Sequence, residues 1–251
     1  MENPYDSPES NDRVQQEHAS RPRWGFLSLL FFLLVVALFI PTLTRGVGVR
    51  KAARRSRCLK NLRRIASAIH DYESDYGSIP PAFTVDENGN RMHSWRTLIL
   101  PYLEEKALYD SIDLTKPWDQ PDNATAYETE VSAYYCPAAN HDSFLTTYLA
   151  AVGPEFCFNG STPRTISEIA DGTARTVMVL DMPEENAVHW MSPNDADEKT
   201  ILAVDENANV SHSGVLIVVR GDCSTRVLSL EEAGENLRAM LTIAGGEEIE
   251  E

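Results

Sequence analysis

The hydrophobic pattern divides the chain into an apolar run, an amphipathic stretch and a region of short apolar segments. The apolar run, Gly25 to Leu43, contains no charged residue. At about 1.5 Å per residue, a helix of this length just crosses the roughly 30 Å hydrocarbon core of a bilayer. Trp24 stands where an interfacial aromatic residue belongs. The pattern therefore predicts a single transmembrane helix over residues 24–44.

Two alternatives compete with a retained membrane span. A secretory signal peptide has a shorter apolar core followed by a small-residue cleavage site, whereas this run ends in Pro41-Thr-Leu-Thr-Arg45. A buried core helix of a soluble domain rarely extends so far without a polar break. We expect the segment to stay in the mature protein as a membrane anchor.

The next stretch predicts an amphipathic helical arm over residues 49–76. Its apolar residues recur at steps of four and three and so form one stripe, whereas the Arg and Lys residues occupy the other faces. Gly77, followed by Pro80 and Pro81, ends the helix. Arm and membrane span would form one almost continuous helix. The stripe consists of Cys58, Leu62, Ile65, Ile69, Tyr72 and Tyr76.

Beyond the arm the pattern changes to short segments, which predict an antiparallel sheet with a few helices. The whole is an α+β fold with one acidic domain over residues 45–251, whose sheet part covers residues 77–247. The predicted elements are a helix at 95–108 interrupted by Pro101, a buried strand at 176–180, a hairpin of 215–219 and 225–230 that turns at Gly221-Asp222, and a helix at 230–243.

Charge follows the same division. Residues 1–23 are polar, with five acids and three bases, and are expected to be a disordered tail. Residues 45–64 carry nine bases and no acid, which suits contact with anionic lipid head groups. Residues 65–251 hold 33 acids and 10 bases, so nucleic acid is excluded as a partner of this domain because its phosphates would be repelled.

The four cysteines, Cys58, Cys136, Cys157 and Cys223, contain no Cys-x-x-Cys pair, which excludes a zinc ribbon and a thioredoxin-like motif. Disulfides require that the domain lie outside the cytoplasm, and buried thiols are the alternative. Spacing leaves the connectivity open.

The bases beside the span lie mostly on its C-terminal side, so the positive-inside rule alone would place the large domain in the cytoplasm.

Signatures of catalysis are missing from the sequence. It has no Gly-x-Ser-x-Gly, no His-Glu-x-x-His, no phosphate loop and no Gly-x-Gly-x-x-Gly. His70, His189 and His212 are expected to make structural hydrogen bonds. We expect a protein without catalytic activity and without a cofactor.

Two kinds of ligand site were weighed against plain structural roles. Four carboxylates could surround a calcium ion, although no Asp-x-Asp-x-Asp loop is present and turn formation is the better interpretation. Trp95, Trp118 and Trp190 could form a carbohydrate platform, but tryptophans near prolines more often belong to the core. The calcium candidates are Asp171, Asp181, Asp195 and Asp222.

Several motifs in combination resemble one known family. The chain contains Cys58-x-x-Asn-Leu-x-x-Ile-x-x-Ala-x-His-x-Tyr-x-x-x-Tyr-Gly-x-x-Pro-Pro81, then Ser94-Trp-Arg, Leu100-Pro-Tyr-Leu-Glu, Tyr135-Cys-Pro and Ile169-x-Asp-Gly-Thr. These are similar to the prepilin-like family known as domain of unknown function 1559, which is expanded in planctomycete bacteria. The resemblance covers roughly residues 49–247.

The resemblance implies a fold similar to type IV pilins and type II secretion pseudopilins, with a long helix half in the inner membrane and an extracytoplasmic sheet domain. For the topology, we give this resemblance more weight than the count of Lys and Arg residues beside the span, and we expect the large domain outside the cytoplasm. Cys58 and Cys136 are the family's usual cysteines, which implies a disulfide between them. Cys157 and Cys223 are extra here and could form a second one, with reduced thiols as the competing outcome.

The chain also departs from the family. Leu30 stands where the prepilin signature has a membrane-embedded Glu, which weakens the case for processing at Gly25 and for filament assembly. Cys223 occupies a turn position that is usually Gly. We expect a single-pass pilin-like protein with a structural or assembly role, which assembles with itself or with other pilin-like proteins through the stripe or the membrane helix. The alternative is a membrane-tethered module that binds calcium or glycan.

Overall fold

The computed structural model describes residues 24–247, with the side chains of residues 25, 28–35 and 48–247. The chain divides into two compact units, residues 1–48 and 49–251. The polar tail predicted over residues 1–23 lies outside the described residues.

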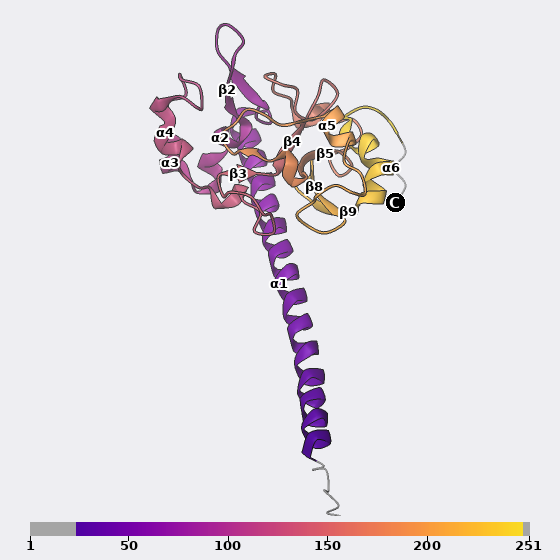
Figure 1. The fold of residues 1–251 in the computed structure, drawn as a ribbon. Coiled ribbons are helices and arrows are strands. Elements are labelled where there is room, and N and C mark those ends of the chain that lie inside the picture. Colours follow the sequence, from indigo (N-terminus) through magenta and orange to yellow (C-terminus); the bar gives the residue numbers. More distant parts are fainter. Residues whose placement is uncertain (1–23, 248–251) are drawn as a thin grey trace, which may run out of the picture. The chain divides into compact units, whose positions relative to one another are not determined.

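Helix α1 (Trp24–Tyr76) begins in the first unit and ends in the second (Figure 1). No helix of the described part is long and apolar enough to cross a membrane. The backbone of the predicted span is part of α1, but the side chains of residues 24, 26, 27 and 36–44 lie outside what the structure describes. The transmembrane helix over residues 24–44 therefore stays a prediction.

The amphipathic half of α1 follows its predicted pattern. Cys58, Leu62, Ile65 and Ile69 are fully buried, whereas Tyr76 at the end of the stripe is 65 % exposed. The helix ends because Gly77 adopts a left-handed conformation with φ 74°, and its N–H donates to the carbonyl oxygen of Glu73. The predicted arm and its end are confirmed.

A five-stranded sheet forms the centre of the second unit (Figure 1). All neighbouring strands are antiparallel except β4 and β7, which run parallel. The predicted hairpin is present as β8 and β9, joined through Gly221 and Asp222. In order across the sheet, the strands are β7 (Ala196–Asp197), β4 (Tyr148–Val152), β5 (Val177–Asp181), β8 (Val215–Arg220) and β9 (Thr225–Ser229).

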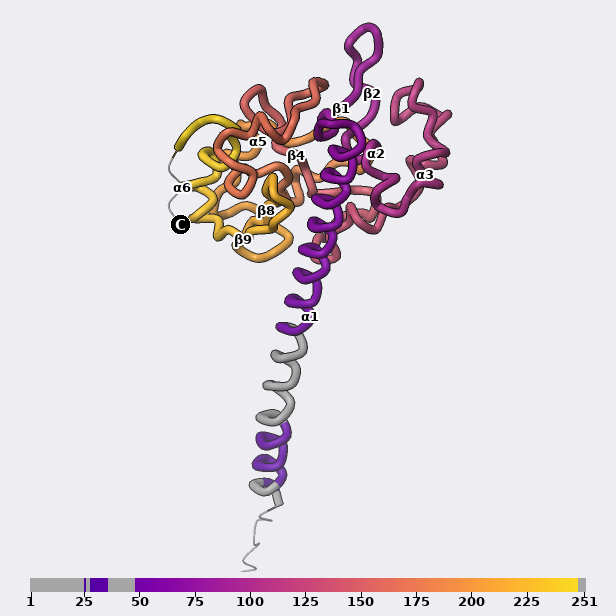
Figure 2. Tube along the Cα trace, turned by 180° about the vertical axis from the view of Figure 1, so that it is seen from behind, coloured from indigo at the N-terminus to yellow at the C-terminus, as the bar shows by residue number. Residues whose placement is uncertain are grey.

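Both faces of this sheet are buried because successive strand residues point to opposite sides. Ile217 and Val219 join the core that contains the stripe of α1. Leu216 and Val218 join a second core with residues of α5 (Glu198–Leu202) and α6 (Leu230–Leu241). Strand β8 accordingly lies between α1 and α6 in both views (Figures 1 and 2).

Short elements complete the second unit. The helix predicted over residues 95–108 is instead three short pieces, with breaks at Ile99 and at Glu104–Glu105, and Pro101 lies inside the second piece. The remaining elements are β1 (Phe83–Val85) paired with β2 (Arg91–Ser94), α2 (Trp95–Leu98), η1 (Leu100–Leu103), α3 (Lys106–Asp110), η2 (Pro121–Asn123), α4 (Ala124–Tyr127), η3 (Ser132–Tyr134), β3 (Leu145–Thr146) paired with β6 (Val188–His189), η4 (Ile166–Glu168) and η5 (Glu184–Asn186).

Candidate functional site

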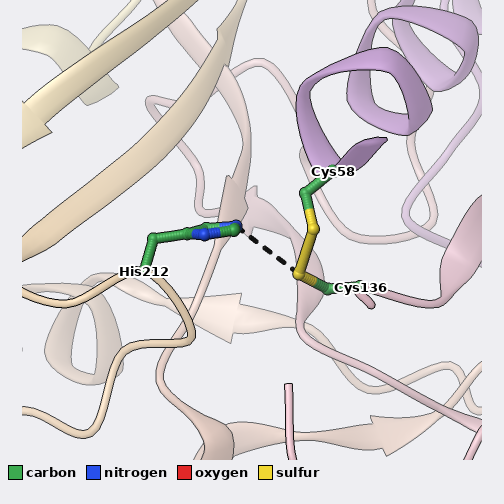
Figure 3. Close-up of side chains that lie close together, drawn as sticks. All are labelled: Cys58, Cys136 and His212. Carbon is green, nitrogen blue, oxygen red and sulfur yellow. Dashed lines mark hydrogen bonds between the residues drawn. A yellow bond between two sulfur atoms is a disulfide. The ribbon is translucent and has the colours of Figure 1, made fainter. Parts of the chain in front are cut away.

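A buried cluster joins α1 to the loops around the sheet. Cys58 of α1 is disulfide-bonded to Cys136, which lies just after η3, and the imidazole of His212 approaches the bond from the loop before β8 (Figure 3). The Cα atoms of the two cysteines are 5.2 Å apart, within the usual range for disulfides. Both cysteines are fully buried, and His212 is 8 % exposed.

The fold brings the two cysteines together through α1. Cys58 is the first residue of the buried stripe, so its side chain faces the domain core. Less than one turn further on, the amide of Asn61 donates to the carbonyl oxygens of Ser132 and Tyr135, at 3.1 and 2.9 Å. These bonds hold the segment that carries Cys136 against the helix.

His212 also contacts a buried carboxylate. Its Nε2 atom lies 3.5 Å from the Sγ atom of Cys136 and 3.5 Å from Oδ2 of Asp181, the last residue of β5. Oδ1 of Asp181 accepts a hydrogen bond from the Thr147 hydroxyl at 2.5 Å. Oδ2 has no hydrogen-bond partner, and its approach to His212 is a contact without a hydrogen bond. The carboxylate is thus half satisfied in a buried place.

Burial sets the protonation of this pair. It lowers the pKa of His212 to about 4, and the positive charge of Arg55 acts in the same direction. Burial raises the pKa of Asp181 to about 7, against the hydrogen bond from Thr147. Both shifts favour the uncharged side chains. Between these values the imidazole has a free nitrogen lone pair.

A cavity of about 520 Å³ reaches the cluster from the surface, and His212 forms part of its wall. The opposite wall is basic, with Lys51, Arg54 and Arg55 of α1, and Ser211 contributes next to His212. His212 is therefore the member of the cluster that a small molecule or ion in the cavity would meet first.

The bonded sulfurs restrict the chemistry of the cluster. A nucleophilic cysteine acts as a thiolate with a histidine as base, and neither sulfur is a thiolate in the disulfide. In this state the cluster is a covalent link between helix and sheet domain, with the His212 imidazole and the half-satisfied Asp181 carboxylate beside it.

The four calcium candidates occupy separate places. Asp171 accepts from the backbone N–H groups of Gly245 and Gly246, and Asp222 accepts from the N–H of Ser224 within its own turn. Asp181 belongs to the disulfide cluster. Within residues 24–247, one group of three His, Cys, Asp or Glu residues has its ligand atoms within 4.8 Å of one another. The group is Cys58, Cys136 and His212. The structure does not bring the four aspartates together.

Asp195, the fourth candidate, forms a buried ion pair with Arg96. The Oδ1 atom lies 2.7 Å from Nη1 of Arg96, and the two side chains are 2 % and 0 % exposed. Trp95 Nε1 and the backbone N–H of Ala150 donate to the same oxygen. This carboxylate serves to anchor the α2 segment to the sheet.

The second predicted disulfide is wrong. Cys157 and Cys223 both carry free thiols. The Cys223 thiol, in the turn between β8 and β9, lies against α1 and donates to the carbonyl oxygen of Ala66 at 3.4 Å. Cys157 is buried between Phe156 and Phe158 after β4. Burial raises the pKa of both thiols, to about 11 for Cys223 and about 12 for Cys157.

The tryptophans divide into two groups. Trp95 and Trp190 are fully buried, as a core role predicts. Trp118 is only half-buried and stacks on Tyr127, with ring centroids 5.8 Å apart. His189 stacks on Tyr127 in turn, at 4.0 Å. Of the three tryptophans considered for a platform, only Trp118 is partly exposed, and it belongs to an aromatic stack with Tyr127 and His189 that the sequence did not indicate.

Sequence reasoning did not connect His212 and Asp181 with the cysteines. The sequence predicts a structural hydrogen bond for His212, and it names Asp181 only among four carboxylates of a calcium site that is less favoured than turn formation. No local motif could have joined them, because the four residues come from α1, the loop after η3, β5 and the loop before β8. The pairing of β5 with β8 brings Asp181 near His212, and the packing of α1 adds the two cysteines.

Comparison with known proteins gives one match. Residues 48–156 match the model of the SBP_bac_10 family, described as protein of unknown function (DUF1559). The matched region includes Cys58 and Cys136 and ends before Asp181 and His212. No curated protein and no solved structure matches the chain. The resemblance to this family is confirmed over that region, whereas the relationship to pilins stays a proposal.

Proposed function

We propose that this chain is a membrane-anchored, pilin-like envelope protein with a structural or assembly role and no catalytic activity. The observation that supports this most directly is the amphipathic half of α1. Its stripe shares one core with the face of the sheet that carries Ile217 and Val219. A helix packed in this way on an antiparallel sheet is the arrangement that the resemblance to pilins implies.

The disulfide supports an extracytoplasmic sheet domain. Disulfides persist in oxidising compartments and are rare in the cytosol. Cys58 and Cys136 are bonded, and the bond lies inside the core. The proposed protein spans the inner membrane once through residues 24–44 and holds its acidic domain outside.

The burial of the stripe changes the expected mode of assembly. Cys58, Leu62, Ile65 and Ile69 are occupied within the domain and cannot bind a second copy. The described apolar side chains of the first unit are exposed, including Phe31 at 68 %. Self-association, or association with other pilin-like proteins, is therefore assigned to the segment before residue 49.

Topology is tested in intact cells with a membrane-impermeant maleimide. The reporter is a cysteine placed at exposed Tyr76 (Tyr76→Cys) in a chain that also carries Cys157→Ala and Cys223→Ser. Labelling before lysis supports an extracytoplasmic domain. Labelling only after lysis, from a chain that sediments with membranes, contradicts this topology, and a chain that stays in the soluble fraction contradicts the membrane anchor.

Assembly is tested by oxidative cross-linking in membranes. Leu30→Cys, in the chain without Cys157 and Cys223, is expected to give cross-linked dimers or hetero-complexes. Val85→Cys, exposed on β1, is the matched control and should give none. If Leu30→Cys and Val85→Cys both gave only the same trace of cross-linked product, assembly through the first unit would be contradicted.

A binding module is the second candidate, and one observation favours its glycan form. The aromatic stack of Trp118, Tyr127 and His189 is partly exposed, with Tyr127 40 % exposed. Sugar rings pack on exposed aromatic side chains. Nothing comparable favours calcium, because the four aspartates lie apart. This alternative is supported if immobilised polysaccharide retains the wild-type protein and does not retain Trp118→Ala. It is contradicted if the wild-type protein is not retained.

A further inference from the structure

The disulfide cluster contains the side chains of a transition-metal site. Two sulfurs, one imidazole and one carboxylate are ligand types that zinc takes in four-coordinate sites. The Sγ atoms of Cys58 and Cys136 and a ring nitrogen of His212 lie within 4.8 Å of one another. Asp181 adds Oδ2 at 3.5 Å from the same imidazole.

Two distances around His212 fit a tetrahedral ion, whereas the bonded sulfurs would have to separate. Zinc binds sulfur at about 2.3 Å and nitrogen or oxygen at about 2.0 Å, so ligand atoms around it lie about 3.5 Å apart. Nε2 of His212 lies 3.5 Å from Cys136 Sγ and 3.5 Å from Asp181 Oδ2. One nitrogen thus already stands at ligand spacing from a sulfur and from an oxygen.

An independent feature points to a missing partner. Asp181 is only 4 % exposed, and its Oδ2 atom is buried without a hydrogen bond. Buried polar atoms are normally satisfied, and a carboxylate oxygen without a donor is costly. A cation bound between Oδ2 and the imidazole would satisfy it.

We propose that the reduced form of the protein binds one Zn²⁺ through Cys58, Cys136, His212 and Asp181, so that disulfide and metal are alternative occupants of the cluster. A dithiol supplies two electrons and two protons, the S–S bond breaks to give two thiols, and the dithiol becomes a disulfide. Zn²⁺ then displaces the two thiol protons, and the sulfurs move apart to bind it as thiolates.

Charge and access both suit this site. Two thiolates and one carboxylate around Zn²⁺ leave one net negative charge, and the guanidinium of Arg55 on the cavity wall is placed to balance it. The cavity of about 520 Å³ gives an ion a path to His212. The site does not depend on the membrane role, and its failure would leave that role standing.

The test uses the full chain in detergent, oxidised or reduced with a phosphine that is then removed, and Co²⁺ as a spectroscopic probe for Zn²⁺. The reduced protein is expected to bind one equivalent of Co²⁺, with tetrahedral visible bands and thiolate charge-transfer absorption that Zn²⁺ abolishes. The oxidised protein is expected to show neither. Equal spectra for the two forms would overturn the proposal.

Variants show whether the folded cluster binds the metal. His212→Ala and Asp181→Asn keep both cysteines and are expected to weaken Zn²⁺ binding at least tenfold. Cys157→Ala with Cys223→Ser is the matched control and should bind as the wild type does. If His212→Ala binds as tightly as the wild type, or if the reduced wild type has lost its folded circular dichroism when it binds, the metal is held by loose cysteines and the proposal fails.

Discussion

Arg96 shows how one residue fixes a large part of the second unit. Its five N–H groups are all used, and the side chain is 0 % exposed. One group bonds to Asp195, and the others bond to backbone carbonyl oxygens, including that of Trp190 in the segment between β6 and β7. A buried charge pair contributes little over an apolar pair, but removing one partner leaves the other charge unpaired.

We therefore expect Arg96→Met to lower the free energy of unfolding by about 3–5 kcal/mol, measured by urea denaturation. Lys106→Met is the control, because Lys106 pairs with Asp110 at 2.7 Å on the surface and its loss should cost under about 1 kcal/mol. Equal losses for both variants would show that Arg96 does not have this role.

Two histidines, buried His93 and half-buried His189, predict a pH dependence. Burial lowers the pKa of His93 and of His189 below the ordinary 6.5. At pH values below about 6.5 the unfolded chain binds protons that the folded chain does not, so these residues stabilise the fold above that pH and lose their contribution as the pH falls through their folded pKa.

The measurement is urea unfolding at pH 7 and at pH 5 for the wild type and for His93→Gln with His189→Gln. The stability difference between the two proteins isolates the histidines from other groups that titrate. The wild type is expected to lose more stability on acidification than the variant does. Parallel losses would contradict a lowered pKa at these sites.

At the scale of the elements, the stripe of α1 decides how the helix docks. Ile65 is 0 % exposed, whereas Tyr76 on the same stripe is 65 % exposed. Ile65→Ala should cost about 2–5 kcal/mol of unfolding free energy because it leaves a cavity, and Tyr76→Ala should cost under about 0.5 kcal/mol. Thermal and urea unfolding measure both. A similar cost at the two positions would mean that the stripe is not the docking surface.

Local signals in the sequence were sufficient for these elements. The spacing of the stripe and Gly77 predicted the arm and its end, and the turn residues predicted the hairpin. The usual Gly at position 223 has a visible reason, because Cys223 adopts φ 63°, in the region that glycine tolerates best. Periodicity and turn chemistry act within a few residues, so they can be read without the fold.

Contacts between distant segments could not be read in the same way. The parallel pairing of β4 with β7 and the cover of the second sheet face by α6 depend on the packing of the whole unit. The same packing places Asp181 and His212 beside the cysteines. The predicted pairing of Cys157 with Cys223 failed for this reason. That two cysteines remain after the first disulfide does not mean that the fold places their thiols together.

At the scale of the whole molecule, the disulfide links residues 78 apart in the chain. Closing a loop of that length should stabilise the fold by about 4 kcal/mol, mainly by restricting the unfolded chain. We expect Cys58→Ser with Cys136→Ser to lose stability of this order in urea unfolding, and Cys223→Ser to change it by under about 1 kcal/mol. Equal stability of the double variant and the wild type would show that the link is not structural.

The same link has a mechanical consequence. If tension is applied between the beginning of α1 and the C-terminus, the covalent bond from Cys58 to Cys136 carries the load past residues 59–135. The buried stripe, the β1–β2 pair and the short helices up to η3 lie inside this shielded loop. Only residues 137–247 can then be extended on the C-terminal side, so pulling would draw out the five-stranded sheet while the end of α1 stays folded.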